Sequence, residues 1–159
     1  MKVHPDFSDF VEALNSSGVE YSIIGAYALA FHGFPRATGD IDFWIRPTIE
    51  NTGLLKKALK KFGFSEIDIS ENDILSGKII QLGFPPVRID LVTRLDGLDD
   101  DEIMDSREKG KFGDQDVWYL SKNAFIKNKQ ATGRYKDLAD LELLGEEPKP
   151  RGTACPRRI

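Results

Sequence analysis

The chain has 159 residues, a formal net charge of −4, and a composition that is 40% hydrophobic and 30% charged. This length and balance suit one ordinary globular domain, and the negative charge argues against a nonspecific grip on a polyanion over the whole surface. No apolar run approaches the roughly 20 residues of a membrane helix, and residues 1–10 lack the apolar stretch of a signal peptide, so we expect a cytoplasmic protein with no membrane partner.

The metal chemistry open to the chain is limited by its few soft ligands. Cys155 is the single cysteine, which excludes an intrachain disulfide, and with only His4 and His32 a closed Cys/His zinc site is excluded as well. A metal must therefore be held mainly by oxygen, which points to Mg²⁺ or Mn²⁺. Residues 121–136 contain five basic residues and no acidic one, so this stretch could face phosphates.

The first segment of the chain predicts a helix, a strand and a second helix around a glycine corner. Apolar residues at helical spacing from residue 5 predict a helix that stops at Gly18. Residues 20–24 predict a short strand. The compact segment 26–32 predicts a short helix that begins directly after Gly25.

The next segment predicts a strand headed by Asp40 and then a longer helix. Residues 41–45 form an apolar run of strand length. Thr48 or Asn51 can cap a helix that runs to about residue 62, and Gly63 closes it.

The second half begins with a predicted hairpin. Residues 78–82 and 87–93 predict two strands, and residues 83–86 between them contain the prolines of a turn. Residues 99–108 predict an acidic, partly helical surface segment, and residues 116–120 predict a last short strand.

The C-terminal segment predicts a pair of helices. Ser121 can cap the first, which runs to about residue 130, and residues 134–144 carry leucines at core-facing spacing. The remaining residues, 145–159, contain three prolines and little to bury, so we expect them to be disordered. Residues 1–144 show no internal boundary and predict a single domain.

Asp40 and Asp42 are the first candidate metal ligands. Acidic residues two apart occur seven times in the chain, so spacing alone selects none of these pairs. Only Asp40 and Asp42 open a strongly apolar strand, in which alternation points both carboxylates to one face with Cα atoms roughly 6 to 7 Å apart. Two like charges at a buried strand end are costly, and a divalent cation would relieve their repulsion.

Asp90 is the candidate third ligand, because it also lies within an apolar strand and two-metal phosphoryl-transfer sites typically need a further carboxylate. This role requires its strand to neighbour the strand of Asp42. The alternative interpretation is that Asp40 is a turn residue and Asp42 faces solvent. In that case Asp90 pairs with Arg88 or Arg94.

Gly25 is the candidate phosphate corner. It ends a strand directly before a short helix, an arrangement in which unpaired amides and the helix N-terminus attract an anion such as a triphosphate. Glycine at such a corner can also simply relieve backbone strain. Its position ahead of the acidic pair is what favours the first interpretation.

Two stretches together form a recognisable pattern, a hydrophobic residue and Gly followed later by Asp-x-Asp. They are Ile23-Ile24-Gly25-Ala26-Tyr27-Ala28-Leu29-Ala30 and Arg36-Ala37-Thr38-Gly39-Asp40-Ile41-Asp42. This resembles the signature of the DNA polymerase beta-like nucleotidyltransferase superfamily. The second stretch and the distal Gly133-Arg134-Tyr135-Lys136-Asp137-Leu138-Ala139-Asp140 look most like the AbiEii-type toxins of type IV toxin–antitoxin systems and their small relatives. The resemblance covers roughly residues 18–144.

The resemblance implies an α/β fold, with a small mixed sheet flanked by helices and a C-terminal helical pair. It implies transfer of a nucleoside monophosphate from a triphosphate to a hydroxyl, with release of pyrophosphate. Asp40 and Asp42 would bind two Mg²⁺ or Mn²⁺ ions, and Asp90 would bind one and help to deprotonate the acceptor. The amides of Gly25 and Ala26 would hold the triphosphate.

The resemblance also makes Lys129, Arg134 and Lys136 candidate contacts to phosphate or acceptor, the alternative being ordinary solvated helix charges. Ala26 departs from the family pattern of Gly or Ser, so a serine hydroxyl contact is absent. The acceptor is left open among RNA, a protein and a small molecule, and an antitoxin is a possible partner. Alternative functions are a catalytically weak or inactive protein that binds nucleotide or a partner, and an antibiotic nucleotidyltransferase.

Four other polar or aromatic residues have structural interpretations. We expect His32 to be a hydrogen-bonded structural histidine and Trp44 to pack in the core, with stacking on a base as the alternative for Trp44 and Tyr27. Arg36 either approaches the site through the loop before Asp40 or remains solvated.

Overall fold

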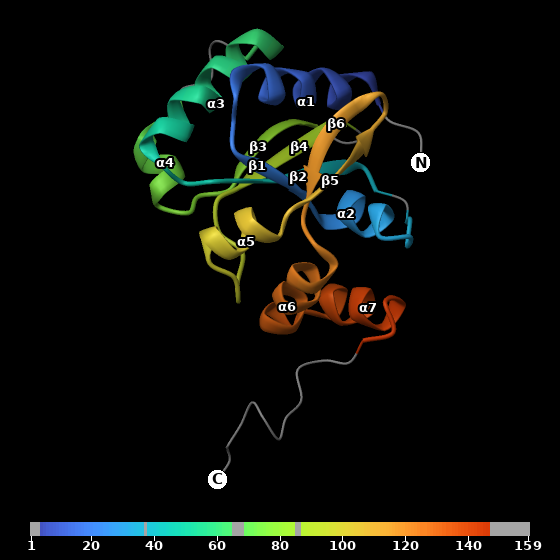
Figure 1. Cartoon of the computed structure of the whole chain (residues 1–159). Coiled ribbons are helices and arrows are strands. Elements are labelled where there is room, and N and C mark those ends of the chain that lie inside the picture. The colour runs from blue at the N-terminus through green and yellow to red at the C-terminus, as the bar shows by residue number, and fades with distance from the viewer. Residues whose placement is uncertain (1–3, 37, 65–68, 85–86, 147–159) are drawn as a thin grey trace.

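The computed structural model describes residues 4–36, 38–64, 69–84 and 87–146. Within these ranges a six-stranded mixed sheet is flanked by helices on both faces (Figure 1). This confirms the predicted fold class. The predicted turn residues 85–86 and most of the predicted disordered tail, residues 147–159, lie outside the described residues.

The strands run in the order β3-β4-β2-β1-β6-β5 across the sheet. Strand β2 pairs parallel to β4 and antiparallel to β1, and β1 in turn pairs parallel to β6. Each edge of the sheet is an antiparallel pair, β3 with β4 and β5 with β6. The bounds are β1 Tyr21–Ile24, β2 Asp40–Ile45, β3 Ile80–Phe84, β4 Val87–Val92, β5 Glu108–Phe112 and β6 Gln115–Tyr119.

Apart from α4, the helices follow the predicted order, and two of them begin at predicted caps. Thr48 and Ser121 accept hydrogen bonds from the first turns of α3 and α6, and α1 and α3 end at Gly18 and Gly63. The bounds are α1 Pro5–Ser17, α2 Gly25–Phe31, α3 Ile49–Phe62, α4 Glu71–Leu75, α5 Asp100–Ser106, α6 Lys122–Thr132 and α7 Tyr135–Leu143. No helix in the described ranges has the length and apolarity needed to cross a bilayer.

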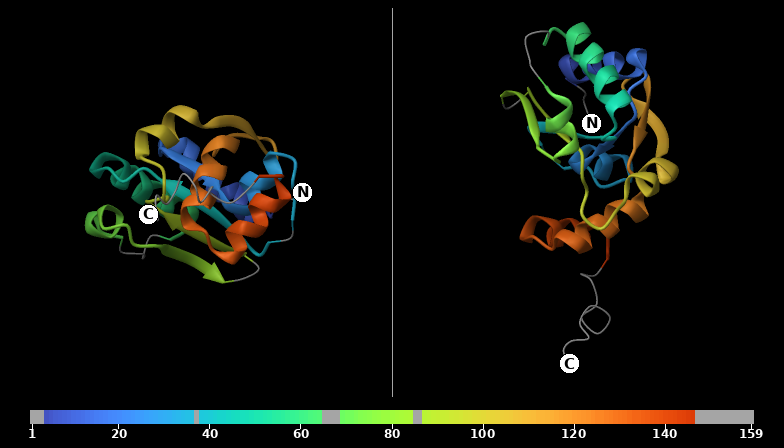
Figure 2. Two further views of the ribbon diagram at one scale, coloured as in Figure 1. Left: turned by 90° about the horizontal axis from the view of Figure 1, so that it is seen from below. Right: turned by 90° about the vertical axis from the view of Figure 1, so that its left-hand side faces the viewer.

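The two faces of the sheet differ in what they bury. Helices α1 and α3 cover one face, where Phe10 of α1 packs edge-on against Phe43 of β2 and Phe62 of α3 at ring distances of 5.2 Å (Figure 1). Along β2 the alternate residues Ile41, Phe43 and Ile45 are fully buried on this apolar side. Alternation therefore turns Asp40 and Asp42 to the opposite face. Helices α6 and α7 stand apart at the end of the molecule on that side (Figure 2).

Two short elements were not predicted, and one predicted strand is shifted. Strand β5 and helix α4 have few apolar residues of their own, and β5 becomes a strand through its pairing with β6. The predicted strand 78–82 is wrong at its ends, because β3 begins at Ile80 and extends through Gly83 and Phe84. Neither error moves a candidate site residue.

Candidate active site

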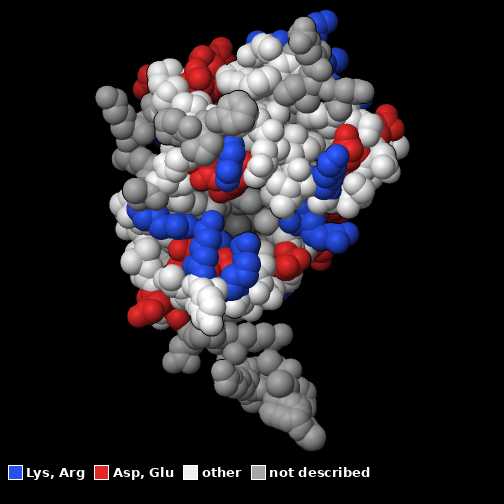
Figure 3. All heavy atoms as spheres, turned by 180° about the vertical axis from the view of Figure 1, so that it is seen from behind, with Lys and Arg blue, Asp and Glu red and all other residues white. Residues whose placement is uncertain are grey.

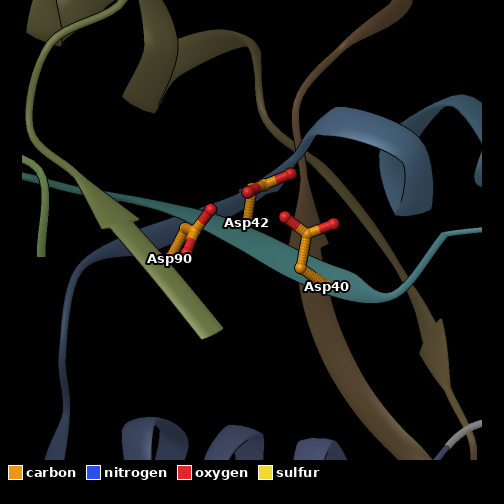
Figure 4. A group of neighbouring side chains, drawn as sticks. All are labelled: Asp40, Asp42 and Asp90. Atoms are coloured by element: carbon orange, nitrogen blue, oxygen red, sulfur yellow. The ribbon is translucent and has the colours of Figure 1, made fainter. Parts of the chain in front are cut away.

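The three candidate aspartates lie together on two adjacent parallel strands. Asp42 of β2 is in register with Asp90 of β4, which confirms that the strands of these two residues are neighbours. One carboxylate oxygen from each of Asp40, Asp42 and Asp90 lies within 4.8 Å of the other two. All three side chains project from the same side of the sheet (Figure 4). We call this group the acidic triad.

Gly25 is fitted closely against the acidic triad. Its φ of +67° lies in the left-handed region, and a Cβ at this position would collide with Oδ2 of Asp42. Only glycine therefore allows β1 to pass into α2 at this distance from the carboxylate. Helix α2 begins at Gly25, its N-cap residue Ile24 offers no side-chain cap, and Ala26 in its first turn is 5% exposed. The first-turn amides of a helix have no partner within the helix.

Arg88 bridges two members of the acidic triad. Its Nη2 lies 2.7 Å from Oδ2 of Asp40, and its Nε lies 3.0 Å from Oδ1 of Asp90. The predicted alternative, an Asp90–Arg88 pair, is thus present in this structure, together with the clustering of the triad. Within the described ranges Asp42 has no ion-pair partner, because the guanidinium reaches only its two neighbours.

The three carboxyl groups differ in acidity because their surroundings differ. Burial, and then the charges of Asp40 and Asp90, raise the pKa of Asp42 to about 7. Burial also raises the pKa of Asp90. Burial opposes ionisation of Asp40 too, but hydrogen bonds from the Thr38 hydroxyl and from Arg88 outweigh it and lower the pKa of Asp40. The triad thus carries more negative charge than its one guanidinium can neutralise.

The donor set fits a hard divalent cation. All three groups offer carboxylate oxygen, which is the ligand that Mg²⁺ and Mn²⁺ prefer. The raised pKa of Asp42 has the same physical origin as this fit, since a nearby positive charge would favour the ionised form that burial and like charges disfavour.

The acidic triad forms one wall of a cleft of about 480 Å³. Helices α6 and α7 form the facing wall, and the space-filling view shows Lys and Arg side chains gathered around a hollow (Figure 3). The charged residues of the lining are Asp40, Asp42, Arg88, Asp90, Arg94, Asp96, Lys129, Arg134 and Lys136. Acidic and basic walls therefore face each other across one opening.

The three basic residues predicted for phosphate or acceptor contact all line this cleft. Lys129 is 7% exposed, so the alternative of a solvated helix charge is wrong for this residue. Its Nζ lies 3.0 Å from Oδ1 of Asp137 and 3.6 Å from Oδ2 of Asp140. Arg134 donates to Asp137 over 2.7 Å, and the charge of Lys136 acts to lower the pKa of Asp40 and Asp42.

The pairing of Lys129 belongs to a second charged group, which we call the α6–α7 cluster. Its members are Arg36, Lys129, Arg134, Asp137 and Asp140. Arg36 reaches Asp140 over 3.4 Å, so the loop that leads to Asp40 is tied to α7. The two acids were not singled out in the sequence. Their spacing of three places them on one helix face, which was the available signal.

The residues given structural interpretations are confirmed in those roles. His32 hydrogen-bonds through Nε2 to the carbonyl of Leu120 over 2.8 Å. Trp44 is fully buried, and Tyr27 packs against the rings of Phe7 and Phe112.

Solved structures with the same arrangement indicate the fold to which this site belongs. A proposed nucleotidyltransferase (TM1012) from Thermotoga maritima aligns with a TM-score of 0.55 at 14% identity, over 91% of this chain and 91% of that chain. The chain has a nucleotidyltransferase fold. The antibiotic-resistance factor ANT(2'')-Ia aligns with a TM-score of 0.53 at 15% identity, over 87% of this chain and 80% of that chain. No protein-family model and no curated protein matches the sequence.

Proposed function

We propose that the chain is a metal-dependent nucleotidyltransferase that moves a nucleoside monophosphate from a nucleoside triphosphate to a hydroxyl. The new bond joins the acceptor oxygen to the α-phosphorus, and the bond from the α-phosphorus to pyrophosphate breaks. The observation that carries the proposal is the acidic triad, which opens onto a cleft with a basic opposite wall. The nucleotidyltransferase fold supports it.

The proposal gives each side of the cleft a role. Asp40, Asp42 and Asp90 hold Mg²⁺ or Mn²⁺, which when bound supplies Lewis-acid stabilisation of the phosphate charge. Asp90, whose pKa is raised mainly by burial, is the proposed acceptor of the proton from the attacking hydroxyl. The amides of Gly25 and Ala26 at the start of α2 face the triphosphate.

The basic wall completes the proposed nucleotide site. Lys136 and Arg134 contribute positive charge from exposed positions on the cleft wall, and Lys129 contributes charge from a buried position. These three residues are the proposed contacts to phosphate or acceptor. Because Lys129 is already paired with buried acids, its contribution is to the field of the wall more than to a free hydrogen bond.

Transfer of label tests the proposal directly. The protein is incubated with Mg²⁺ or Mn²⁺, each α-labelled nucleoside triphosphate in turn, and total RNA or lysate as acceptor. We expect label in a macromolecule or small-molecule product, and a loss of more than about 100-fold in Asp42→Asn, since even outer-shell changes at metal sites cost 10 to 100-fold. Asp114→Asn, in the exposed β5–β6 turn, is the matched control and keeps activity. Transfer that is equal in both variants would reject the proposal.

The acceptor has two candidates with separate support. The similarity in fold to the antibiotic-resistance factor ANT(2'')-Ia favours an antibiotic hydroxyl, and the sequence resemblance to AbiEii-type toxins favours a toxin whose acceptor is RNA or a protein. Expression that protects cells against an antibiotic supports the first. Growth arrest, relieved by a neighbouring antitoxin gene, supports the second.

An inactive nucleotide-binding protein is the remaining alternative, and Ala26 motivates it. The buried Ala26 has no hydroxyl to donate to a phosphate. Calorimetry separates this alternative from an enzyme, because an inert protein binds triphosphate without dependence on Mg²⁺ and releases no pyrophosphate.

A further inference from the structure

Arg88 lies where the acidic triad needs a positive charge. Its Nη2 donates to Oδ2 of Asp40 over 2.7 Å and to Oδ2 of Asp90 over 3.1 Å, and its Nε lies 3.0 Å from Oδ1 of Asp90. The sheet itself sets this geometry, because Arg88 is opposite Asp40 in the parallel register and two residues before Asp90 on the same strand. The strand register therefore places Arg88 beside both aspartates.

The guanidinium and a divalent cation would use the same oxygens. Arg88 contacts one oxygen of Asp40 and both oxygens of Asp90. Mg²⁺ demands near-octahedral oxygen geometry at about 2.0 to 2.1 Å, which leaves no room for an arginine fork on the same lone pairs. Full coordination by the acidic triad thus requires Arg88 to turn away from at least part of it.

The cleft gives the released side chain a second place to bind. Arg88 lines the cleft together with Arg94, Arg134 and Lys136, and its side chain is 30% exposed. A planar guanidinium donates two parallel hydrogen bonds to carboxylate and phosphate alike. A triphosphate in the cleft would offer such oxygens close to the triad.

We propose that Arg88 is a positioning residue with two successive partners. It first pairs with Asp40 and Asp90 as their counter-ion. When a divalent cation binds, Arg88 releases the carboxylate oxygens, which then coordinate the cation. Arg88 finally turns into the cleft to bind the triphosphate. The second partner rests on the proposed function, whereas the exchange with the cation does not. If Arg88 only held the carboxylates in place, its removal would let them separate and would lower the affinity of the triad for the cation.

Calorimetry with Mn²⁺ alone tests the exchange. We expect Arg88→Gln to bind Mn²⁺ at least about tenfold more tightly than the unmodified protein, since a competing charge is removed from two ligands. Arg94→Gln is the matched control: it removes one positive charge from the same cleft, and within the described ranges Arg94 makes no ion pair with the triad. We expect it to change Mn²⁺ affinity by less than about threefold. Equal or weaker Mn²⁺ binding by Arg88→Gln than by Arg94→Gln would overturn the proposal.

Inorganic tripolyphosphate preloaded with Mn²⁺ tests the second partner without assuming a base. Arg88→Gln should bind this probe at least about fivefold more weakly, so that one substitution tightens one ligand and weakens the other. Arg88→Lys keeps the charge without the fork, and we expect both of its affinities to lie between those of the other two proteins. Tighter binding of both probes by Arg88→Gln would overturn the second step.

The outcome for Arg88 is separable from that of the proposed function. Neither measurement needs transferase activity, and circular dichroism melting shows whether each variant is folded. Opposite shifts in the two affinities, without label transfer by the unmodified protein, would keep Arg88 in this role and reject the enzyme. Label transfer with unchanged affinities in Arg88→Gln would keep the enzyme and reject the role of Arg88.

Discussion

In the described part of the chain, the acidic triad and the α6–α7 cluster are two charged groups that are built in opposite ways. In the acidic triad three carboxylates face the single guanidinium of Arg88. In the α6–α7 cluster the two carboxylates of Asp137 and Asp140 face three cations. The cluster is neutralised by its own side chains and fixes α7 to α6 and to the loop before Asp40. The triad keeps negative charge that no described side chain in contact with it neutralises, so a bound cation would stabilise it.

One carboxyl group of the cluster, Asp137, and one of the triad, Asp42, show the same contrast in their pKa. Although burial opposes its ionisation, hydrogen bonds from Arg134, Thr132 and Lys129 hold the pKa of Asp137 far below its usual value. Burial and like charges instead raise the pKa of Asp42 to about 7. The ionised carboxylate of Asp137 therefore stabilises the fold, and the ionised carboxylate of Asp42 destabilises it while no cation is bound.

The largest predicted effect comes from breaking the cluster. Asp137 is fully buried and accepts bonds from Lys129, Thr132 and Arg134. Asp137→Asn leaves the buried Lys129 without its nearest counter-ion and should lower the free energy of unfolding by about 3 to 5 kcal/mol, measured by urea denaturation. Asp116→Asn breaks the exposed pair with Lys111 and should cost less than about 1 kcal/mol. Similar losses of stability in the two variants would mean that burial does not strengthen the ion pairs of the cluster.

The next prediction tests how closely Gly25 packs against Asp42 of the triad. Gly25→Ala must adopt a positive φ and also displaces the Asp42 carboxylate, whereas Gly18→Ala has a similar φ of +76° with open space around the added methyl. The backbone strain alone costs about 1 to 2 kcal/mol, so this is the expected loss in Gly18→Ala. We expect a larger loss in Gly25→Ala, together with weaker Mn²⁺ binding. Equal losses by thermal unfolding would contradict the close contact.

A smaller effect of opposite sign is expected in the triad. Asp42→Asn removes one of three like charges from a buried site, so it should raise the free energy of unfolding. We expect a gain on the order of 1 kcal/mol, less than the displacement of the Asp42 pKa from 3.8 to about 7 implies, because the buried amide must still be desolvated. Urea denaturation in the presence of a chelator measures this gain. A loss of stability like that of Asp137→Asn would remove the distinction between the two groups.

The sequence predicted the triad better than its surroundings, for a physical reason. Asp40 and Asp42 lie in one strand, and local alternation placed them on one face. Asp90 needed only the further step that its strand be a neighbour. The bridge by Arg88 depends on the register between β2 and β4, which no local pattern encodes.

The remaining elements show the same limit. Most helices and strands followed from periodicity and caps, whereas β5 has little apolar character and depends on its pairing with β6. Lys129 is one of several basic residues in its stretch, and nothing local distinguishes it from the others. Its burial between Asp137 and Asp140 arises only when α7 folds back on α6.

The smallest predicted effect is a pH dependence of stability, which tests whether ionisation of Asp42 is what destabilises the triad. In the unfolded chain this group titrates near 3.8, and in the folded protein near 7. Between these values the folded protein keeps a proton that the unfolded chain has lost, so the contribution of Asp42 to stability falls as the pH rises through this window and is constant above it. The stability gain of Asp42→Asn should therefore be small at about pH 5 and larger at about pH 8. At about pH 8, added Mg²⁺ should raise the free energy of unfolding of the unmodified protein, because the ionised triad is the form that binds Mg²⁺. A gain that is the same at both pH values would show that Asp42 does not carry the excess charge of the triad.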